Sequence, residues 1–300
     1  MLFPVRWISL PGAVLGWVLF SVFRLARRTT LKNLAIALAD RTEAERLRIA
    51  ASCYRFFGGV ILEYLSLPRI PPRRMSEFVT LEGMDVLRAA LAEGRGAMVM
   101  GGHLGNWEMV APTLAASGLP ISIYVGGQRN FMVDRAMNAI RAARGSRIIG
   151  KGNPRGLVRA LKERDAIAII ADHHEPAQRY FVAYFGQPVS AAPGPAQLLL
   201  RSGAAMLMTN CIREGRFRYR AQFVRLPLPP PTGDEERDIL AITQVYFSAL
   251  EEAVRRHPEQ YFWMHRHFRD IGASARLTDG NRAFLAERGI ALPLGAAVNP

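Results

Sequence analysis

His103 and Glu108 are the two side chains whose types and spacing are best suited to chemistry. They belong to the segment Gly-Gly-His-Leu-Gly-Asn-Trp-Glu at residues 101–108. A carboxylate bound to one nitrogen of an imidazole fixes its tautomer and leaves the other nitrogen to act as a general base. The pair can meet if His103 lies in a turn and Glu108 lies in the first turn of a helix. It would supply two members of a catalytic triad, which suffices when the substrate brings its own hydroxyl. The alternative is a structural histidine that caps a helix.

The elements around this pair would place it at the edge of a sheet. Residues 96–100 form an apolar run between glycines, which indicates a buried strand, and residues 106–117 have the pattern of a helix. A second buried strand is expected at residues 166–171. His103 would then follow the carboxyl end of a strand, where open α/β sheets bind ligands.

Strands and helices alternate along the rest of the chain. This alternation predicts an α/β fold with a largely parallel central sheet flanked by helices. A hairpin is expected about Glu214 and Gly215. Three hundred residues suit one large domain of this kind. The remaining helices are expected at residues 31–67, 82–93, 134–144, 154–164, 194–202 and 238–257.

The amino-terminal region has the composition of a membrane anchor. Residues 7–23 carry no charge and approach the span of about 20 residues that a bilayer requires. Basic residues follow directly, an asymmetry that would put the next domain on the cytoplasmic side. A buried amphipathic helix is the alternative. We therefore divide the chain into a membrane-anchor helix at residues 1–30, an α/β domain at residues 31–270 and a tail at residues 271–300.

The charge and the cysteines restrict the function further. A formal net charge of +14 predicts an anionic partner, whether a nucleic acid, an acidic membrane, a phosphorylated substrate or an acidic protein. Cys53 and Cys211 have no metal-binding or redox spacing and are expected to be ordinary thiols in a reducing compartment. A serine hydrolase is not favoured, because the chain lacks a Gly-x-Ser-x-Gly elbow.

Two other segments contain groups that bind metals or phosphate in other proteins. Residues 172–175, Asp-His-His-Glu, are dense in metal-binding groups, but adjacent loop histidines usually point apart and no distant third ligand is evident. The sequence therefore predicts no metal. Residues 150–156 lack the spacing of a phosphate-binding loop.

Three motifs in order give the chain a family resemblance. The segment at residues 101–108, the pair Asp172-His173 after a strand, and the run His257-Pro-Glu-Gln-Tyr-Phe-Trp-Met-His-Arg-His-Phe268 resemble the late acyltransferases of lipid A biosynthesis, of the lauroyl and myristoyl type. These enzymes belong to a broader lysophospholipid acyltransferase group with a His-x4-Asp/Glu motif. The resemblance covers roughly residues 15 to 270. The chain departs from it at Tyr124-Val-Gly, where the family often has Tyr-Arg-Pro.

The resemblance implies an O-acyltransferase of the bacterial inner membrane, with its catalytic domain on the cytoplasmic face. The donor would be an acyl thioester of acyl carrier protein or coenzyme A, and the acceptor a hydroxyl of a membrane glycolipid such as a lipid A precursor. His103 would be the general base and Glu108 would orient it, with no cofactor and no metal. The residues expected to bind substrate or order the site are Gly105, Asn106, Arg141 and Asp172. The resemblance also places His265 and His267 in a packing segment, which implies that they are structural or rim residues.

Several alternatives stay open at this stage. An enzyme of the same family could acylate another glycolipid, a lysophospholipid or a hydroxy-lipid. A basic nucleic-acid-binding protein or a lipid-binding protein without catalytic activity would belong to a different class. The membrane-acyltransferase interpretation itself expects no nucleic acid as a partner.

Overall fold

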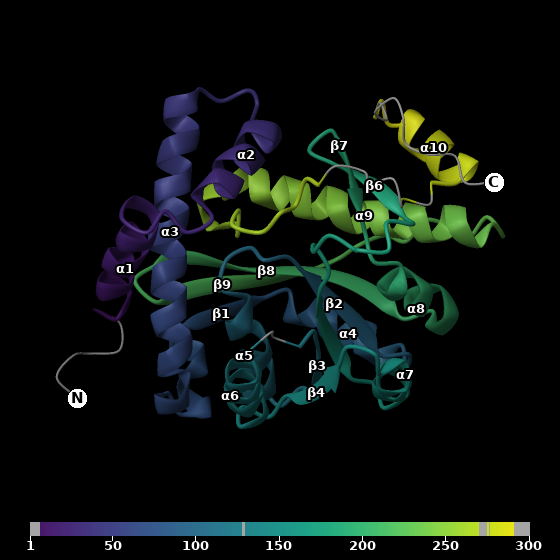
Figure 1. The fold of residues 1–300 in the computed structure, drawn as a ribbon. Helices are drawn as coiled ribbons and strands as arrows, with labels where there is room; N and C mark the ends of the chain where they lie inside the picture. The colour runs from purple at the N-terminus through teal and green to yellow at the C-terminus, as the bar shows by residue number, and fades with distance from the viewer. Residues whose placement is uncertain (1–6, 128–129, 270–274, 276, 291–300) are drawn as a thin grey trace.

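A seven-stranded sheet forms the centre of the molecule. The computed structural model describes residues 7–127, 130–269, 275 and 277–290 (Figure 1). The strand order is β1-β9-β8-β2-β5-β3-β4, and every neighbouring pair is parallel except β8 and β9. The predicted mixed α/β fold with a largely parallel sheet is confirmed. The strands are β1 (Val79–Glu82), β2 (Ala97–Gly101), β3 (Ile121–Val125), β4 (Arg147–Gly150), β5 (Ala166–Ile170), β8 (Ala205–Gly215) and β9 (Arg218–Arg225).

Helices cover the sheet on both sides. In Figure 1, α9 runs along one side of β8, and α4 and α5 lie on the other. The strands at the centre of the sheet are buried along their length, β2 completely. Parallel strands covered on both faces become apolar runs of this kind. The helices after β1 are α4 (Met84–Ala92), α5 (Val110–Ala116), α6 (Phe131–Ala142), α7 (Pro154–Lys162), α8 (Gly194–Ser202) and α9 (Glu235–Arg256).

Three α-helices precede the sheet: α1 (Ser9–Ser21) lies in the predicted anchor segment, and α2 (Arg27–Ala37) and α3 (Glu43–Ser66) replace the one long helix that was predicted at residues 31–67. The prediction missed the break because it followed apolar spacing alone. Thr42 and Glu45 form a capping box that starts a new helix after a turn.

Helix α1 packs on α3 through small residues. A Cβ atom added to Gly16 would lie 2.0 Å from the carbonyl oxygen of Tyr54, so only glycine allows this approach of the two backbones. The opposite side of α1 exposes large apolar side chains, among them Val14 and Trp17. Among the residues described, none of the helices has the length and apolar character needed to cross a bilayer.

A small hairpin and a C-terminal helix were, like strands β1 and β4, absent from the sequence prediction. An antiparallel hairpin of β6 (Phe181–Tyr184) and β7 (Gln187–Ser190) stands apart from the main sheet and packs on α9. Helix α10 (Asp279–Ala286) lies within the predicted tail and contacts α9 and β6 (Figure 1). Asn281 fixes it there, because its side chain bonds both the N–H and the carbonyl of Phe181.

Candidate active site

His103 lies just beyond the carboxyl end of β2, beside the end of β5. The register of these parallel strands places Gly101 opposite Ile170, so the residues two positions further on, His103 and Asp172, also become neighbours. The Nδ1 atom of His103 lies 2.6 Å from Oδ1 of Asp172. The backbone N–H of His103 donates to the other carboxylate oxygen at 2.9 Å. Two bonds therefore fix both the position of the imidazole and its tautomer.

Asp172 is suited to remain ionised beneath this ring. Its side chain is fully buried, and Oδ2 also accepts a hydrogen bond from the Tyr261 hydroxyl at 3.0 Å. Burial alone would raise the pKa of the carboxyl group, but the charge of His103 and its hydrogen bonds, with a smaller contribution from His267, hold that pKa well below its usual range. A permanent negative charge thus lies next to Nδ1.

Glu108 does not occupy the place that the sequence analysis gave it. Its carboxylate accepts two bonds from Arg141, at 2.6 and 3.0 Å, and one from the indole N–H of Trp107 at 3.2 Å. The side chains of Glu108 and Arg141 are each only 11% exposed. The chain turns after His103 into a short 3-10 helix, Trp107–Met109, which directs Glu108 toward α6. Asp172 is therefore the carboxylate that contacts His103, and the predicted His103–Glu108 contact is corrected.

Trp107 connects the two ion pairs. Its ring lies 4.7 Å from that of His103, edge to face, while its N–H bonds Glu108. Arg141 lies where the sequence analysis expected it, on a helix next to the motif. The structure thus brings together His103, Asp172, Glu108 and Arg141, but as the pairs His103–Asp172 and Glu108–Arg141 in place of the predicted His103–Glu108 pair.

Gly105 and Asn106 hold the loop after His103 against the sheet and do not face an open site. Their backbone N–H groups donate to Gln260 and Cys211. Gly105 has a φ of +68°, and an added Cβ would lie 2.0 Å from the Cys211 carbonyl oxygen. The Asn106 side chain is 1% exposed and donates weakly, at 3.4 Å, to Glu63 and Tyr219. These donors are already engaged, so the predicted substrate-binding role of Gly105 and Asn106 does not fit this geometry.

The terminal Pro-Glu-Gln-Tyr segment binds the other side of this loop. The carbonyl of His103 accepts a hydrogen bond from the N–H of Phe262 at 2.9 Å. The Gln260 side chain bonds the backbone of Arg213 in both directions, at 2.8 and 3.1 Å. Asn33, from α2, donates to the carbonyl of Trp263 at 2.8 Å. The segment therefore joins α2, β8 and the His103 loop.

A buried ion pair anchors α3 to the β8–β9 hairpin behind this loop. Arg213 lies 2.7 Å from Glu63, and both contact the Tyr219 hydroxyl. Burial raises the pKa of Glu63, although the charge of Arg213 opposes the shift. Arg213 and Tyr219 had no motif that could have identified them.

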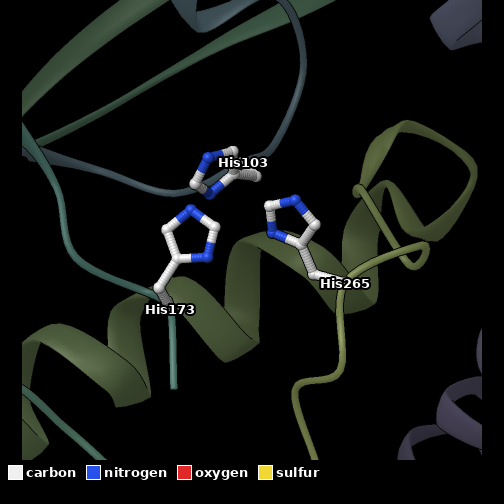
Figure 2. Close-up of side chains that lie close together, drawn as sticks. All are labelled: His103, His173 and His265. Carbon is white, nitrogen blue, oxygen red and sulfur yellow. The ribbon is translucent and has the colours of Figure 1, made fainter. Parts of the chain in front are cut away.

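Three histidines from distant segments converge at the site. His103, His173 and His265 each place a ring nitrogen within 4.8 Å of the others (Figure 2). Desolvation, followed by repulsion from the charge of His103, lowers the pKa of His173 to about 4 and that of His265 to about 3. Both rings are therefore neutral at pH 7. His265 was interpreted as structural, and the sequence offered no signal that it would meet His103.

An apolar groove of about 860 Å³ begins at His173. Its lining extends from Lys151, which follows the carboxyl end of β4, to Arg95, which precedes the amino end of β2. The groove therefore runs along the strands, from their carboxyl ends to their amino ends. Helices α7 and α8 form its walls. The apolar side chains that line it include Leu157, Val158, Leu161, Ile169 and Leu198, and the basic ones are Arg95, Lys151, Lys162 and Arg201.

The chain matches one family over most of its length. A model of the bacterial lipid A biosynthesis acyltransferase family matches residues 1–270. The lipid A biosynthesis palmitoleoyltransferase of Escherichia coli (strain K12) is 26% identical over 280 residues, which cover 90% of each chain. The lipid A biosynthesis lauroyltransferase of the same organism is 23% identical over 86% of this chain and 84% of its own. A phosphatidylinositol mannoside acyltransferase of Mycobacterium tuberculosis (strain ATCC 25618 / H37Rv) is 27% identical over 86% and 80%, respectively.

Proposed function

Since the chain belongs to the bacterial lipid A biosynthesis acyltransferase family and is an O-acyltransferase, we propose that it moves a fatty acyl chain from a thioester of acyl carrier protein or coenzyme A to a hydroxyl of a membrane glycolipid such as a lipid A precursor. The observation that carries the proposal is the imidazole of His103, bonded through Nδ1 to the buried carboxylate of Asp172. It lies beside an apolar groove, because the ring of His173, which lines that groove, is 4.3 Å from that of His103.

His103 acts as the general base in this mechanism. Its Nε2 atom takes the proton of the acceptor hydroxyl as the hydroxyl oxygen attacks the thioester carbonyl carbon. The carbon–sulfur bond then breaks, and His103 returns the proton to the departing thiolate. Asp172 stabilises the imidazolium formed between these steps, as the aspartate of a catalytic triad does. The reaction as proposed uses no covalent enzyme intermediate and no cofactor.

Glu108 and Arg141 have a different task in this proposal. Glu108 holds the guanidinium of Arg141 at the edge of the site with two hydrogen bonds. Arginine binds phosphate and carboxylate groups through a rigid, planar set of donors. We assign Arg141 to an anionic group of the donor or acceptor, and Glu108 to positioning Arg141 and Trp107.

The groove between α7 and α8 accommodates the acyl chain. Its apolar walls suit a hydrocarbon, and ligand pockets of several hundred cubic ångströms bury most of a ligand of this size. Lys151 lies at the end of the groove near His173 and suits the anionic carrier of the thioester. The acyl group would therefore enter at the histidines and extend toward Arg201 at the opposite end.

The exposed face of α1 binds the cytoplasmic surface of the bacterial inner membrane in this proposal. Leu10, Val14 and Trp17 are large apolar side chains that remain exposed on a helix whose other side packs on α3. A helix with one apolar face and basic residues beside it lies in the interface of an anionic membrane. The basic residues that follow α1 are Arg24, Arg27, Arg28 and Lys32.

A second acceptor is supported by one of the relatives. The mycobacterial protein is named for acylation of phosphatidylinositol mannoside, and its identity to this chain, 27%, is close to the 26% of the palmitoleoyltransferase. Another membrane glycolipid is therefore the alternative acceptor. The chemistry at His103 is the same in both cases.

Lipid analysis tests the proposal and separates the two acceptors. Total lipids from cells with the intact protein, with His103→Ala, and without the protein are compared by mass spectrometry. We expect the last two to lack one acyl group on the same glycolipid, and its mass identifies the acceptor and the chain length. The proposal fails if cells with His103→Ala, present at the normal level in the membrane fraction, have the same lipid profile as cells with the intact protein.

A further inference from the structure

The site contains more histidines than the proposed acyl transfer requires. One imidazole and its carboxylate, His103 and Asp172, suffice for the proposed mechanism, and His173 and His265 have no part in it. They nevertheless approach His103 from two separate loops, with ring centres 4.3 and 5.0 Å from its own (Figure 2). We propose that His103, His173 and His265 bind a divalent transition-metal ion such as Zn²⁺, and that the bound ion inhibits the enzyme. The inhibition rests on the proposed function, whereas the binding does not.

The ligand set fits zinc better than the abundant hard cations. Three imidazoles and a water molecule are a familiar zinc coordination set, with Zn–N distances of about 2.0–2.1 Å. Mg²⁺ and Ca²⁺ require oxygen ligands, which this cluster does not offer. No sequence pattern indicates this set, because its three histidines come from three separate segments and it leaves out His174 and Glu175 of the metal-rich run at residues 172–175.

The geometry requires a modest closure of the rings. Tetrahedral coordination at these bond lengths needs nitrogens about 3.3 Å apart, and the largest separation among the three is within 4.8 Å. The cluster consists of loop residues: His173 follows β5 and is exposed, and His265 lies within the terminal motif at residues 257–268. In the proposed site, rotation of these side chains brings the nitrogens closer together.

The surroundings of the cluster favour metal binding in two ways. Asp172 occupies Nδ1 of His103 and so leaves Nε2 as the ligand atom, an arrangement in which a carboxylate orients a metal-binding histidine. The Nδ1 atom of His265 is buried without a hydrogen-bond partner among the described residues. A buried polar atom without a partner is costly, and reorientation onto a metal would relieve that cost.

Inhibition follows from the atom that the metal would use. The proposed reaction needs the lone pair of Nε2 on His103 to accept a proton, and a metal bound there withholds it. A metal-bound site would recover when a chelator removes the ion. His173 also lines the groove, so the ion would lie at the entrance of the acyl chain.

Calorimetric titration of the chelator-treated, detergent-solubilised full chain with Zn²⁺ tests the binding. We expect one ion per chain. The affinity should fall by a factor of about 10 to 100 or more in His173→Gln and in His265→Gln. His257→Gln, which alters a histidine at the end of α9 outside the cluster, should bind Zn²⁺ as the wild type does, and Mg²⁺ should give no heat of binding. The proposal is overturned if wild type shows no saturable binding or if both cluster variants retain its affinity.

An activity measurement tests the inhibition separately. Zn²⁺ should stop acyl transfer by the wild type and ethylenediaminetetraacetate should restore it. The concentration for half inhibition, measured against each variant's own uninhibited rate, should rise in His173→Gln and His265→Gln by the factor found for binding. Binding at the cluster without loss of rate would refute the inhibition while the proposed function stands. A wild type with no transferase activity would refute the proposed function, and the titration would still decide the metal site.

Discussion

Replacing Asp172 with asparagine tests which carboxylate serves His103. Asparagine has the same shape and fits the same buried position, but it cannot neutralise the imidazolium that forms during proton transfer. The Asp172 carboxylate is 2.6 Å from Nδ1 and its side chain is fully buried, so water cannot stabilise the imidazolium in place of the carboxylate. We expect kcat to fall by about a hundredfold to ten-thousandfold, the usual contribution of an oriented general base. This fall corresponds to about 3–5 kcal/mol of transition-state stabilisation.

The assay is the initial rate of acyl transfer from an acyl thioester at saturating acceptor concentration. Asp165→Asn is the matched control, because Asp165 is buried at the opposite end of the same strand, where it accepts a bond from Ser122 at 2.6 Å. Equal melting temperatures of the two variants would separate catalysis from folding. The reasoning is refuted if Asp172→Asn keeps the wild-type kcat, or if Asp165→Asn loses as much.

Three further predictions follow from the loop and its neighbours. Gly105→Ala should destabilise the protein by several kcal/mol in urea unfolding, because its Cβ would collide with the Cys211 carbonyl at a positive φ; an unchanged midpoint would contradict this. Glu108→Gln alone should lower the melting temperature, because it leaves the charge of Arg141 buried without a carboxylate; the free energy of unfolding should fall by about 3–5 kcal/mol. Glu108→Gln combined with Arg141→Met should recover most of that loss. Equal losses in the single and the double variant would show that the pair does not act as a unit. Cys53 and Cys211 should resist a thiol reagent in the native state at pH 8 and react in urea, since burial raises the pKa of Cys53 to about 12 and that of Cys211 further; the rate on native protein should rise with pH, and rapid labelling at pH 8 would refute the burial.

The sequence predicted the core of the fold because parallel strands buried on both faces consist of consecutive apolar residues, which are recognisable in a sequence. Residues 96–100 and 166–171 were placed as strands, and they are β2 and β5 within one residue at each end. The hairpin about Glu214 and Gly215 is the β8–β9 pair. The resemblance to the lipid A acyltransferases is confirmed over residues 1–270. These features depend on local composition, which a sequence displays directly.

Short strands and helix breaks were missed for the opposite reason. Strands β1 and β4 have four residues each, and their pairing partners rather than their own pattern make them strands. The break between α2 and α3 depends on the capping box of Thr42 and Glu45 inside an otherwise continuous apolar spacing. The β6–β7 hairpin packs on α9, and β6 lies more than fifty residues before that helix. The residues of the hairpin themselves contain no pattern that predicts this distant contact.

The site shows the same division between local and distant information. Spacing along the chain favoured Glu108 as the partner of His103, because five residues are near in sequence. The strand register makes Asp172 nearer in space, since β2 and β5 are adjacent although 69 residues separate the two side chains. Asp172 was identified as a site residue, but its role required the strand order, which the sequence does not give.

The terminal Pro-Glu-Gln-Tyr segment shows why a conspicuous motif need not supply a reacting group. Gln260 and Phe262 bond the backbone on both sides of Leu104, through the N–H of Gly105 and the carbonyl of His103. Tyr261, between them, donates to Asp172. The segment therefore positions both His103 and Asp172, and in the proposed mechanism none of its groups transfers a proton. A Tyr261→Phe variant should accordingly keep measurable turnover, with a loss of activity smaller than that of Asp172→Asn in the same assay, because it removes one of the three hydrogen bonds to Asp172 and leaves both bonds to His103. A loss as large as that of Asp172→Asn would show that the hydroxyl of Tyr261 acts in the reaction itself.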